Sequence, residues 1–91
     1  MPKQVADKKK MLIRVHRIQG QVQAIERALG EDVPCTQLLQ QLCAIRGAMD
    51  GLMRELLQVH LKDELVDGDT TSAQRAKALT DINQILTSYF R

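Results

Sequence analysis

The chain has 91 residues, of which 44% are hydrophobic and 2% aromatic, and its formal net charge is +2. This length fits one domain spanning residues 1–91, and the apolar content excludes a disordered protein. A monomer of this size buries a modest share of its surface, so we expect it to associate. No apolar run is long enough to span a bilayer, and the charged start lacks the apolar core of a signal peptide. We therefore expect a cytoplasmic protein without a membrane partner, whose two cysteines are free thiols.

Two breaks, at residues 30–34 and 67–72, divide the chain into three predicted helices. The first helix covers about 5–29, the second about 34–65 and the third about 72–89. In the first two, apolar residues alternate at spacings of four and three, the pattern of a coiled-coil seam. No segment alternates with a period of two. The sequence therefore predicts an all-α, three-helix protomer.

The same spacing predicts the helix ends and the buried faces. Gly30 suits the end of the first helix, Asp32 is a candidate N-cap of the second, and Pro34 fits its first turn. The residues expected to face the core are Met11, Val15, Ile18, Val22, Ile25 and Leu29 in the first helix, Leu38, Leu42, Ile45, Met49, Leu52, Leu56 and Val59 in the second, and Ala76, Leu79, Ile82, Leu86 and Tyr89 in the third.

The second helix is too long for a compact monomer, because it would extend on the order of 45 Å. Two copies of the first two helices, packed as an antiparallel four-helix bundle, would cover its apolar stripe. The small residues Gly47, Ala48 and Gly51 lie where two such helices would cross. A coiled coil with a purely structural role and no DNA binding is the alternative, and heptads alone do not exclude it.

Few residues offer chemistry, and no enzyme motif is present, so we do not expect an enzyme. Cys35 lies in the first turn of the second helix, where the helix dipole favours a thiolate. His60 and Glu64 are four residues apart near its other end and share one face. Cys35 and His60 are separated by about 37 Å along one straight helix, so they can meet only across an antiparallel pair of chains. Alternatively, Cys35 is a small apolar residue at a helix start, and His60 complements the helix dipole.

The two remaining candidates have simpler interpretations. Cys43 lies within the apolar stripe of the second helix, and we interpret it as a core residue. His16 lies among basic residues, and we interpret it as a surface residue that faces solvent or phosphate.

Basic residues crowd the first seventeen positions, which suits a polyanionic partner such as double-stranded DNA. A solvated helix start is the alternative. Lys10, Arg14 and Arg17 share one face of the first helix, opposite its seam, and Gln21 extends that face. We add Arg46 as a further DNA-binding candidate. No helix-turn-helix pattern accompanies them, so affinity should come largely from backbone charge and DNA shape.

The chain closely resembles the CsoR/RcnR/FrmR family of bacterial transcriptional repressors in two stretches, RVHRIQGQVQAIERAL at 14–29 and LLQQLCAIRGAMDGLMRELLQVHL at 38–61. This family senses copper, nickel and cobalt, or formaldehyde. The resemblance covers residues 8–65 well and the third helix loosely. It implies a three-helix protomer, an antiparallel four-helix-bundle dimer and a disc-shaped tetramer, which binds operator DNA until its effector releases it.

The resemblance also ranks the effectors. Copper sensors of the family have a second Cys at the position of Glu64, and nickel and cobalt sensors have His at positions 3 and 64, where this chain has Lys3 and Glu64. A carboxylate does not replace the soft thiolate that copper(I) prefers. The formaldehyde sensors carry Pro2, Cys35, His60 and Glu64, and this chain has all four. The resemblance is therefore closest to the formaldehyde-responsive branch.

The chemistry of Pro2 fits that branch. Removal of Met1 would leave a secondary amine on Pro2, and the Cys35 thiol and this amine could be joined by one formaldehyde carbon. We expect no required cofactor, with His60 and Glu64 supporting the site. The alternative is a metal-responsive repressor, in which Cys35, His60 and Glu64 bind a divalent ion such as zinc or cobalt.

Overall fold

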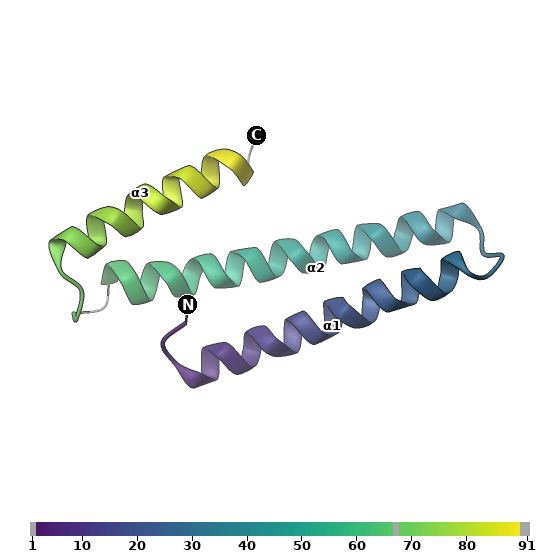
Figure 1. The fold of residues 1–91 in the computed structure, drawn as a ribbon, viewed down its shortest axis with the longest axis horizontal. Coiled ribbons are helices and arrows are strands. Elements are labelled where there is room, and N and C mark those ends of the chain that lie inside the picture. The colour runs from purple at the N-terminus through teal and green to yellow at the C-terminus, as the bar shows by residue number, and fades with distance from the viewer. Residues whose placement is uncertain (1, 67, 90–91) are drawn as a thin grey trace.

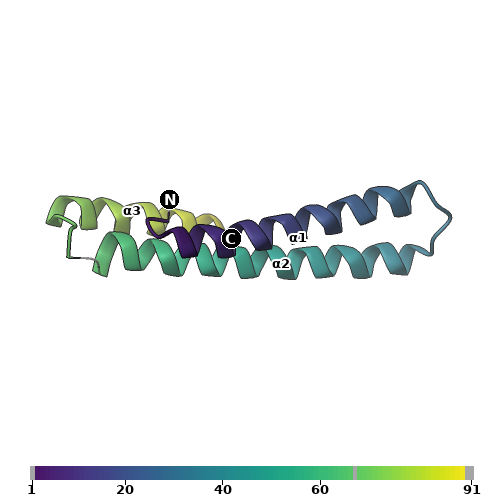
Figure 2. The ribbon, with the colours of Figure 1, turned by 90° about the horizontal axis from the view of Figure 1, so that it is seen from below.

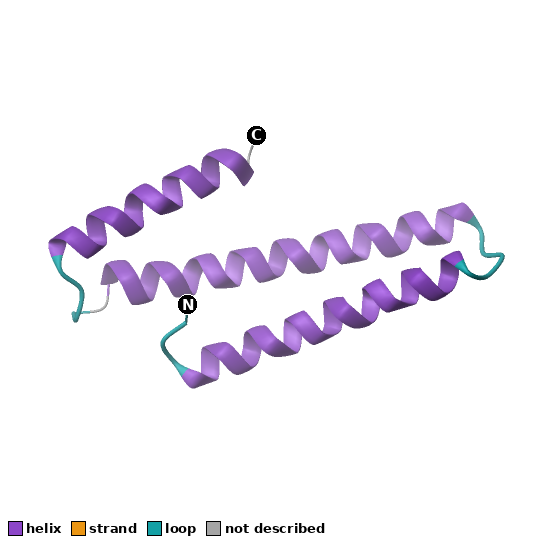
Figure 3. Ribbon diagram, viewed as in Figure 1, coloured by secondary structure: helices purple, strands orange, loops and turns teal. Residues whose placement is uncertain are grey.

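The computed structural model describes residues 2–66 and 68–89, which form three α-helices: α1 (Val5–Leu29), α2 (Cys35–Leu61) and α3 (Ser72–Tyr89). No strand occurs in these two ranges (Figure 3), so the predicted all-α class is confirmed. α1 and α2 form an antiparallel hairpin, and α3 turns back beside α2 on the side away from α1 (Figure 1). Seen from below, the molecule is thin (Figure 2), and its principal extents are 56 × 31 × 14 Å. Within the described residues, no helix has the length and apolarity of a membrane span.

The predicted limits of α1 and α3 are confirmed, whereas those of α2 differ. The prediction of Asp32 as N-cap is wrong, because Pro34 takes that position with an extended backbone and α2 begins only at Cys35. Asp32 therefore lies too far before the helix to reach its first N–H groups. At the other end, the α-helix stops at Leu61 and continues as a π-helical turn, η1 (Lys62–Val66).

Local hydrogen bonds define the end of α1 and the start of α3. Gly30 caps α1 as predicted, in a right-handed rather than left-handed backbone conformation. Thr71 Oγ1 accepts a hydrogen bond from the Gln74 N–H at 3.1 Å, and Gln74 Oε1 accepts one from the Thr71 N–H at 2.9 Å. This reciprocal pair is a capping box, which contributes about 1 kcal/mol to the start of a helix. It explains why α3 begins at Ser72.

The hydrophobic core of one chain is small. Besides Pro2, the buried apolar residues in the described ranges are Met11, Ala28, Val59, Ala78 and Ile82. Large apolar side chains on all three helices remain exposed, among them Val22, Leu29, Leu39, Leu42, Met49, Met53, Leu56, Leu79, Ile85 and Tyr89. Alternate residues of the predicted seam of α2, Leu42, Met49 and Leu56, are therefore left uncovered by their own chain.

Several predicted core positions are exposed in the single chain, namely Val22, Leu29, Leu42, Cys43, Met49, Leu56, Ala76, Leu79 and Tyr89. Ala28 is buried in place of its neighbour Leu29, because α1 turns a slightly different face to α2 near the hairpin loop. On α3, Ala78 and Ile82 are buried, whereas Leu79 is 51% exposed. Cys43 is also exposed rather than part of a core, since α1 covers one side of α2 and Cys43 lies outside that side.

The end of α3 contacts α2 through a polar pair of Tyr89 and Asp50. The Tyr89 hydroxyl donates a short hydrogen bond to the Asp50 carboxylate. This hydrogen bond raises the pKa of Tyr89, with smaller contributions from desolvation and from the charge of Asp50, while Arg54 and Arg46 oppose the rise. The contact therefore requires a protonated phenol and is lost as the pH rises through the raised pKa.

Replacing Asp50 with Ala should lower the pKa of Tyr89 toward its ordinary value of 10.0, because the phenol then loses its carboxylate acceptor. Ultraviolet absorbance titration measures this directly, since Tyr89 is the sole tyrosine and the chain has no tryptophan. Asp81→Ala, which removes a carboxylate of α3 paired with Lys77, is the control and should leave the titration unchanged. An Asp50→Ala titration that matches wild type would contradict the assignment.

Candidate functional site

The predicted effector residues lie at two opposite ends of α2. Cys35 is the first residue of α2 and is an exposed free thiol. His60 is half-buried in the last turn of α2, and Glu64 is half-buried in η1. Along the helix, Cys35 and His60 are separated by about 37 Å. No group of three metal-ligating side chains gathers within the described part of the chain, so one chain does not bring Cys35, His60 and Glu64 together.

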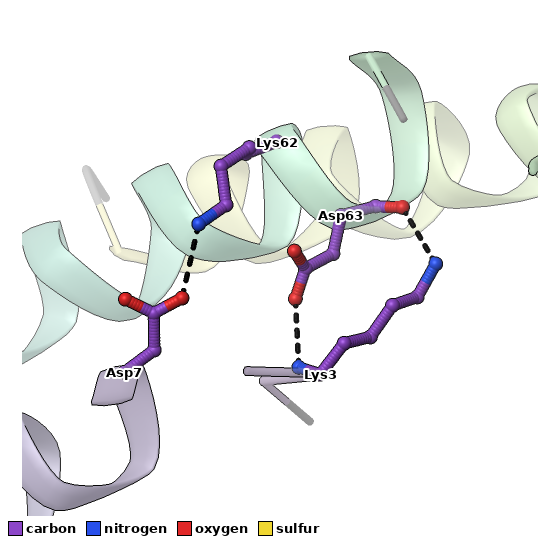
Figure 4. A network of polar contacts seen from close by, with 4 residues as sticks. All are labelled: Lys3, Asp7, Lys62 and Asp63. Carbon is purple, nitrogen blue, oxygen red and sulfur yellow. Dashed lines mark hydrogen bonds and ion pairs between the residues drawn. The ribbon is translucent and has the colours of Figure 1, made fainter. Parts of the chain in front are cut away.

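The N-terminal arm, residues 2–4, lies at the His60–Glu64 end of α2. The Lys3 backbone N–H donates to Asp63 Oδ2 at 2.9 Å, and Lys3 Nζ donates to the Asp63 backbone oxygen at 2.9 Å (Figure 4). Beside this pair, Lys62 Nζ contacts Asp7 Oδ2 at 3.0 Å. These contacts attach the arm and the first turn of α1 to η1.

Pro2 is buried at the edge of an open apolar pocket of about 350 Å³. The other residues that line this pocket are Lys8, Met11, Leu12, Val15, Leu52 and Leu56. Leu56 lies one helical turn before His60, so the two share a face of α2. The structure therefore places Pro2 with the half of the predicted site that contains His60 and Glu64, and away from Cys35 of its own chain.

The basic row lies beside the α1–α2 contact, and not opposite the seam of α1 as predicted, because Arg14 reaches Glu55 of α2. Lys10, Arg14 and Arg17 line a shared surface depression together with Ile13 and Glu55. The Arg14 guanidinium pairs through Nε with the Glu55 carboxylate of α2. It also passes Gly51, where an added Cβ would lie 3.0 Å from Arg14 Nη1. Gly51, predicted to permit close approach of a second chain, thus makes room for Arg14 of its own chain, whereas Gly47 has open space around it.

The remaining DNA-binding candidates lie apart from this depression. Gln21 is half-buried, and its side-chain oxygen is shielded from solvent without a hydrogen-bond partner in the described residues. Arg46 is exposed on α2, near enough to Tyr89 to influence its pKa, and so belongs to the side of α2 that faces α3. The structure therefore groups Lys10, Arg14 and Arg17 but not Gln21 and Arg46.

Comparison with known proteins agrees with the resemblance carried by the sequence. A sequence model of the metal-sensitive transcriptional repressor family matches residues 7–88. The chain belongs to this family. It is 43% identical over 88 residues to the transcriptional repressor RcnR of Salmonella arizonae, with 96% of each chain covered. It is 42% identical over 85 residues to a protein encoded in the bioA 5' region of Serratia marcescens, with 93% of each covered.

A solved structure extends this agreement to the fold. The E64H variant of the formaldehyde-responsive regulator FrmR from Salmonella enterica serovar Typhimurium matches with a TM-score of 0.90 and 51% identity, over 97% of this chain and 99% of that one. The family and its FrmR branch are thus confirmed. Members of the family are transcriptional repressors rather than enzymes. Membership of a repressor family implies that the chain binds DNA.

Sequence reasoning missed the residues that hold the arm and the basic row. Lys3 and Asp63 are sixty positions apart, and no spacing rule relates residues that far apart in sequence. Glu55, to which the sequence pattern assigns no role, pairs with Arg14. Charge pairs between helices depend on how the hairpin closes, so the sequence carried no signal for them.

Proposed function

We propose that this chain is an operator-binding repressor that leaves DNA when formaldehyde joins the amine of Pro2 to the thiol of Cys35 of the partner subunit. The observation that carries the proposal is the position of the N-terminal arm. Lys3 binds Asp63 at the end of α2 where His60 and Glu64 lie, and Cys35 is at the opposite end. Antiparallel pairing of two α2 helices would bring the partner's Cys35 to this arm.

The reaction needs no oxidant or cofactor. The Cys35 sulfur adds to the carbon of formaldehyde, and the proton passes to the carbonyl oxygen, which gives S–CH2–OH. The secondary amine of Pro2, free once Met1 is removed, then displaces the hydroxyl group. The hydroxyl leaves with the amine hydrogen as water, and an N–CH2–S bridge remains. The bridge would restrain the arm and α1, which carries the basic row, and so favour a form of the oligomer that fits DNA poorly.

Exposed apolar side chains support the dimer that this reaction requires. Leu42, Met49 and Leu56 recur every seven residues along α2, and each is more than one third exposed. Heptad-spaced apolar residues are the contacts of antiparallel helical bundles. We infer a homodimer built on this stripe and a homotetramer built from two dimers. We expect this repressor to act in the cytoplasm.

Replacing Leu42 with Asp should abolish self-association, because a carboxylate would be buried in the proposed α2–α2 contact. Sedimentation velocity measures the change in mass. Leu79→Asp is the matched control: Leu79 is exposed to the same extent, 51%, but lies on α3, and this variant should keep at least the dimer. If Leu42→Asp sediments as wild type, the proposed interface is wrong.

Formaldehyde should add the mass of one carbon atom to each chain, since one formaldehyde is gained and one water is lost. Intact mass spectrometry measures this gain, and denaturing electrophoresis should show covalently linked pairs of chains. The matched control is Cys43→Ala, which removes the other exposed thiol and should react as wild type. Cys35→Ala should gain no carbon and should stay on operator DNA in the presence of formaldehyde.

A metal-responsive repressor is the second candidate, favoured by the match to a family described as metal-sensitive. Across an antiparallel dimer, the partner's Cys35 with His60 and Glu64 would offer a divalent ion one sulfur, one nitrogen and one oxygen donor. Anaerobic titration with cobalt, zinc and copper(I) separates the two candidates. Tight metal binding coupled to DNA release, with no response of the wild type to formaldehyde, would favour the metal.

We infer that the depression lined by Lys10, Arg14 and Arg17 contacts the DNA backbone. The three cations lie together on an exposed face of α1, and an oligomer would repeat this face. Lysine and arginine bind phosphate without reading sequence. Glu55 would hold the Arg14 side chain in place until phosphate competes for it.

Arg14→Ala and Arg17→Ala should each weaken operator binding and lower the slope of log affinity against log salt by about one unit for each phosphate contact removed. Fluorescence anisotropy at several salt concentrations measures both quantities. Lys77→Ala removes the same charge from α3, where Lys77 makes an exposed pair with Asp81, and should change neither. Equal effects from all three variants would indicate a nonspecific response to net charge.

A further inference from the structure

The N-terminal arm is attached to one residue by two different groups. Asp63 accepts the Lys3 backbone N–H with its side chain and the Lys3 ammonium with its backbone oxygen, both at 2.9 Å (Figure 4). Together these bonds fix both the backbone and the side chain of the residue that follows Pro2. The arm therefore has a defined position at Lys3.

Asp63 is an unusual partner because its carboxylate is buried. It is 3% exposed, whereas most charged residues of the described chain lie at the surface. Burying a carboxylate is costly unless hydrogen bonds compensate for lost water. The Lys3 backbone N–H supplies one such bond. Detaching the arm would remove that donor from a buried carboxylate, so the attached position is favoured.

The path of the arm leads past His60. Pro2 shares a pocket with Leu56, and Lys3 contacts Asp63. Leu56 and His60 are one turn apart on α2 and share a face, and Asp63 follows in the π-helical turn η1. The arm is thus held by residues on both sides of His60 in the sequence.

We propose that Lys3 and Asp63 are positioning residues for formaldehyde capture, holding the Pro2 amine where the partner's Cys35 arrives. This inference rests on the proposed function. The thiol adds formaldehyde without help from the arm. Closing the N–CH2–S bridge, with loss of water, requires the amine to lie close to the S–CH2–OH carbon. Holding two reacting groups in place raises their effective concentration, so the Lys3–Asp63 pair speeds the second step and leaves the first unchanged.

The test compares the rate of bridge formation in quenched formaldehyde reactions, followed by intact mass spectrometry. Asp63→Ala removes the acceptor of the Lys3 N–H and should slow bridge closure by about tenfold or more. Lys3→Ala keeps the backbone N–H but loses the ammonium bond, and should slow it to a smaller extent. Asp63→Asn keeps an oxygen acceptor and should restore most of the wild-type rate. Because Lys3 is exposed, Lys3→Ala tests the proposal even if Asp63→Ala does not fold.

Asp7→Ala is the matched control. It removes the neighbouring ion pair with Lys62, which joins α1 to η1, and should close the bridge at the wild-type rate. Two further measurements should stay unchanged in all variants: operator affinity without formaldehyde, and the rate at which a thiol reagent modifies Cys35. A purely structural role for Asp63 would alter both of these.

The outcomes separate the inference from the function on which it rests. If wild type forms the bridge and both Asp63→Ala and Lys3→Ala form it equally fast, the positioning role is wrong and the formaldehyde function stands. If wild type gains no carbon, both are wrong. A rate lowered equally by Asp7→Ala would assign the effect to general attachment of α1 and would overturn the specific role of Lys3 and Asp63.

Discussion

Burial of the apolar stripe of α2 is the constraint on which the rest of the molecule depends. α1 covers one side of α2 and leaves side chains such as Leu42, Met49 and Leu56 exposed. Exposed apolar surface on this scale marks an interaction site in a stable protein. Self-association along α2 would satisfy the stripe, and it would also complete the effector site, because Cys35 and His60 lie at opposite ends of the same helix. The same α2–α2 contact would then stabilise the protein and form its effector site.

The N-terminal arm gives the effector site its second component. Lys3 binds the buried Asp63, which places Pro2 beside the His60 end of α2 within its own chain. A covalent bridge from Pro2 to the partner's Cys35 would tie two subunits together at this point. Because the arm leads directly into α1, any change at Pro2 is close to the helix that carries Lys10, Arg14 and Arg17. The proposed effector and DNA-binding surfaces are thus linked through one helix.

The basic face is itself balanced by an acidic residue. Arg14 pairs with Glu55 across the hairpin, and Gly51 leaves room for the guanidinium. The pair fixes the direction of Arg14 before DNA arrives, so less side-chain freedom would be lost on binding. It also ties the basic row to α2, so that the position of α1 relative to α2 would control how these cations face the phosphate backbone in the proposed complex with DNA.

The sequence by itself determined the helices and the family. Apolar periodicity and the glycine and proline breaks fixed the limits of α1 and α3, because these signals act within a few residues. Helix length alone showed that Cys35 and His60 cannot meet in one chain. Only the tertiary structure decided which residues hold the arm, which face of α3 is buried and where Cys43 lies. These depend on how the helices pack, as do the N-cap at Pro34 and the π-helical turn η1. The Lys3–Asp63 pair joins residues sixty positions apart, and only the closed hairpin brings them together.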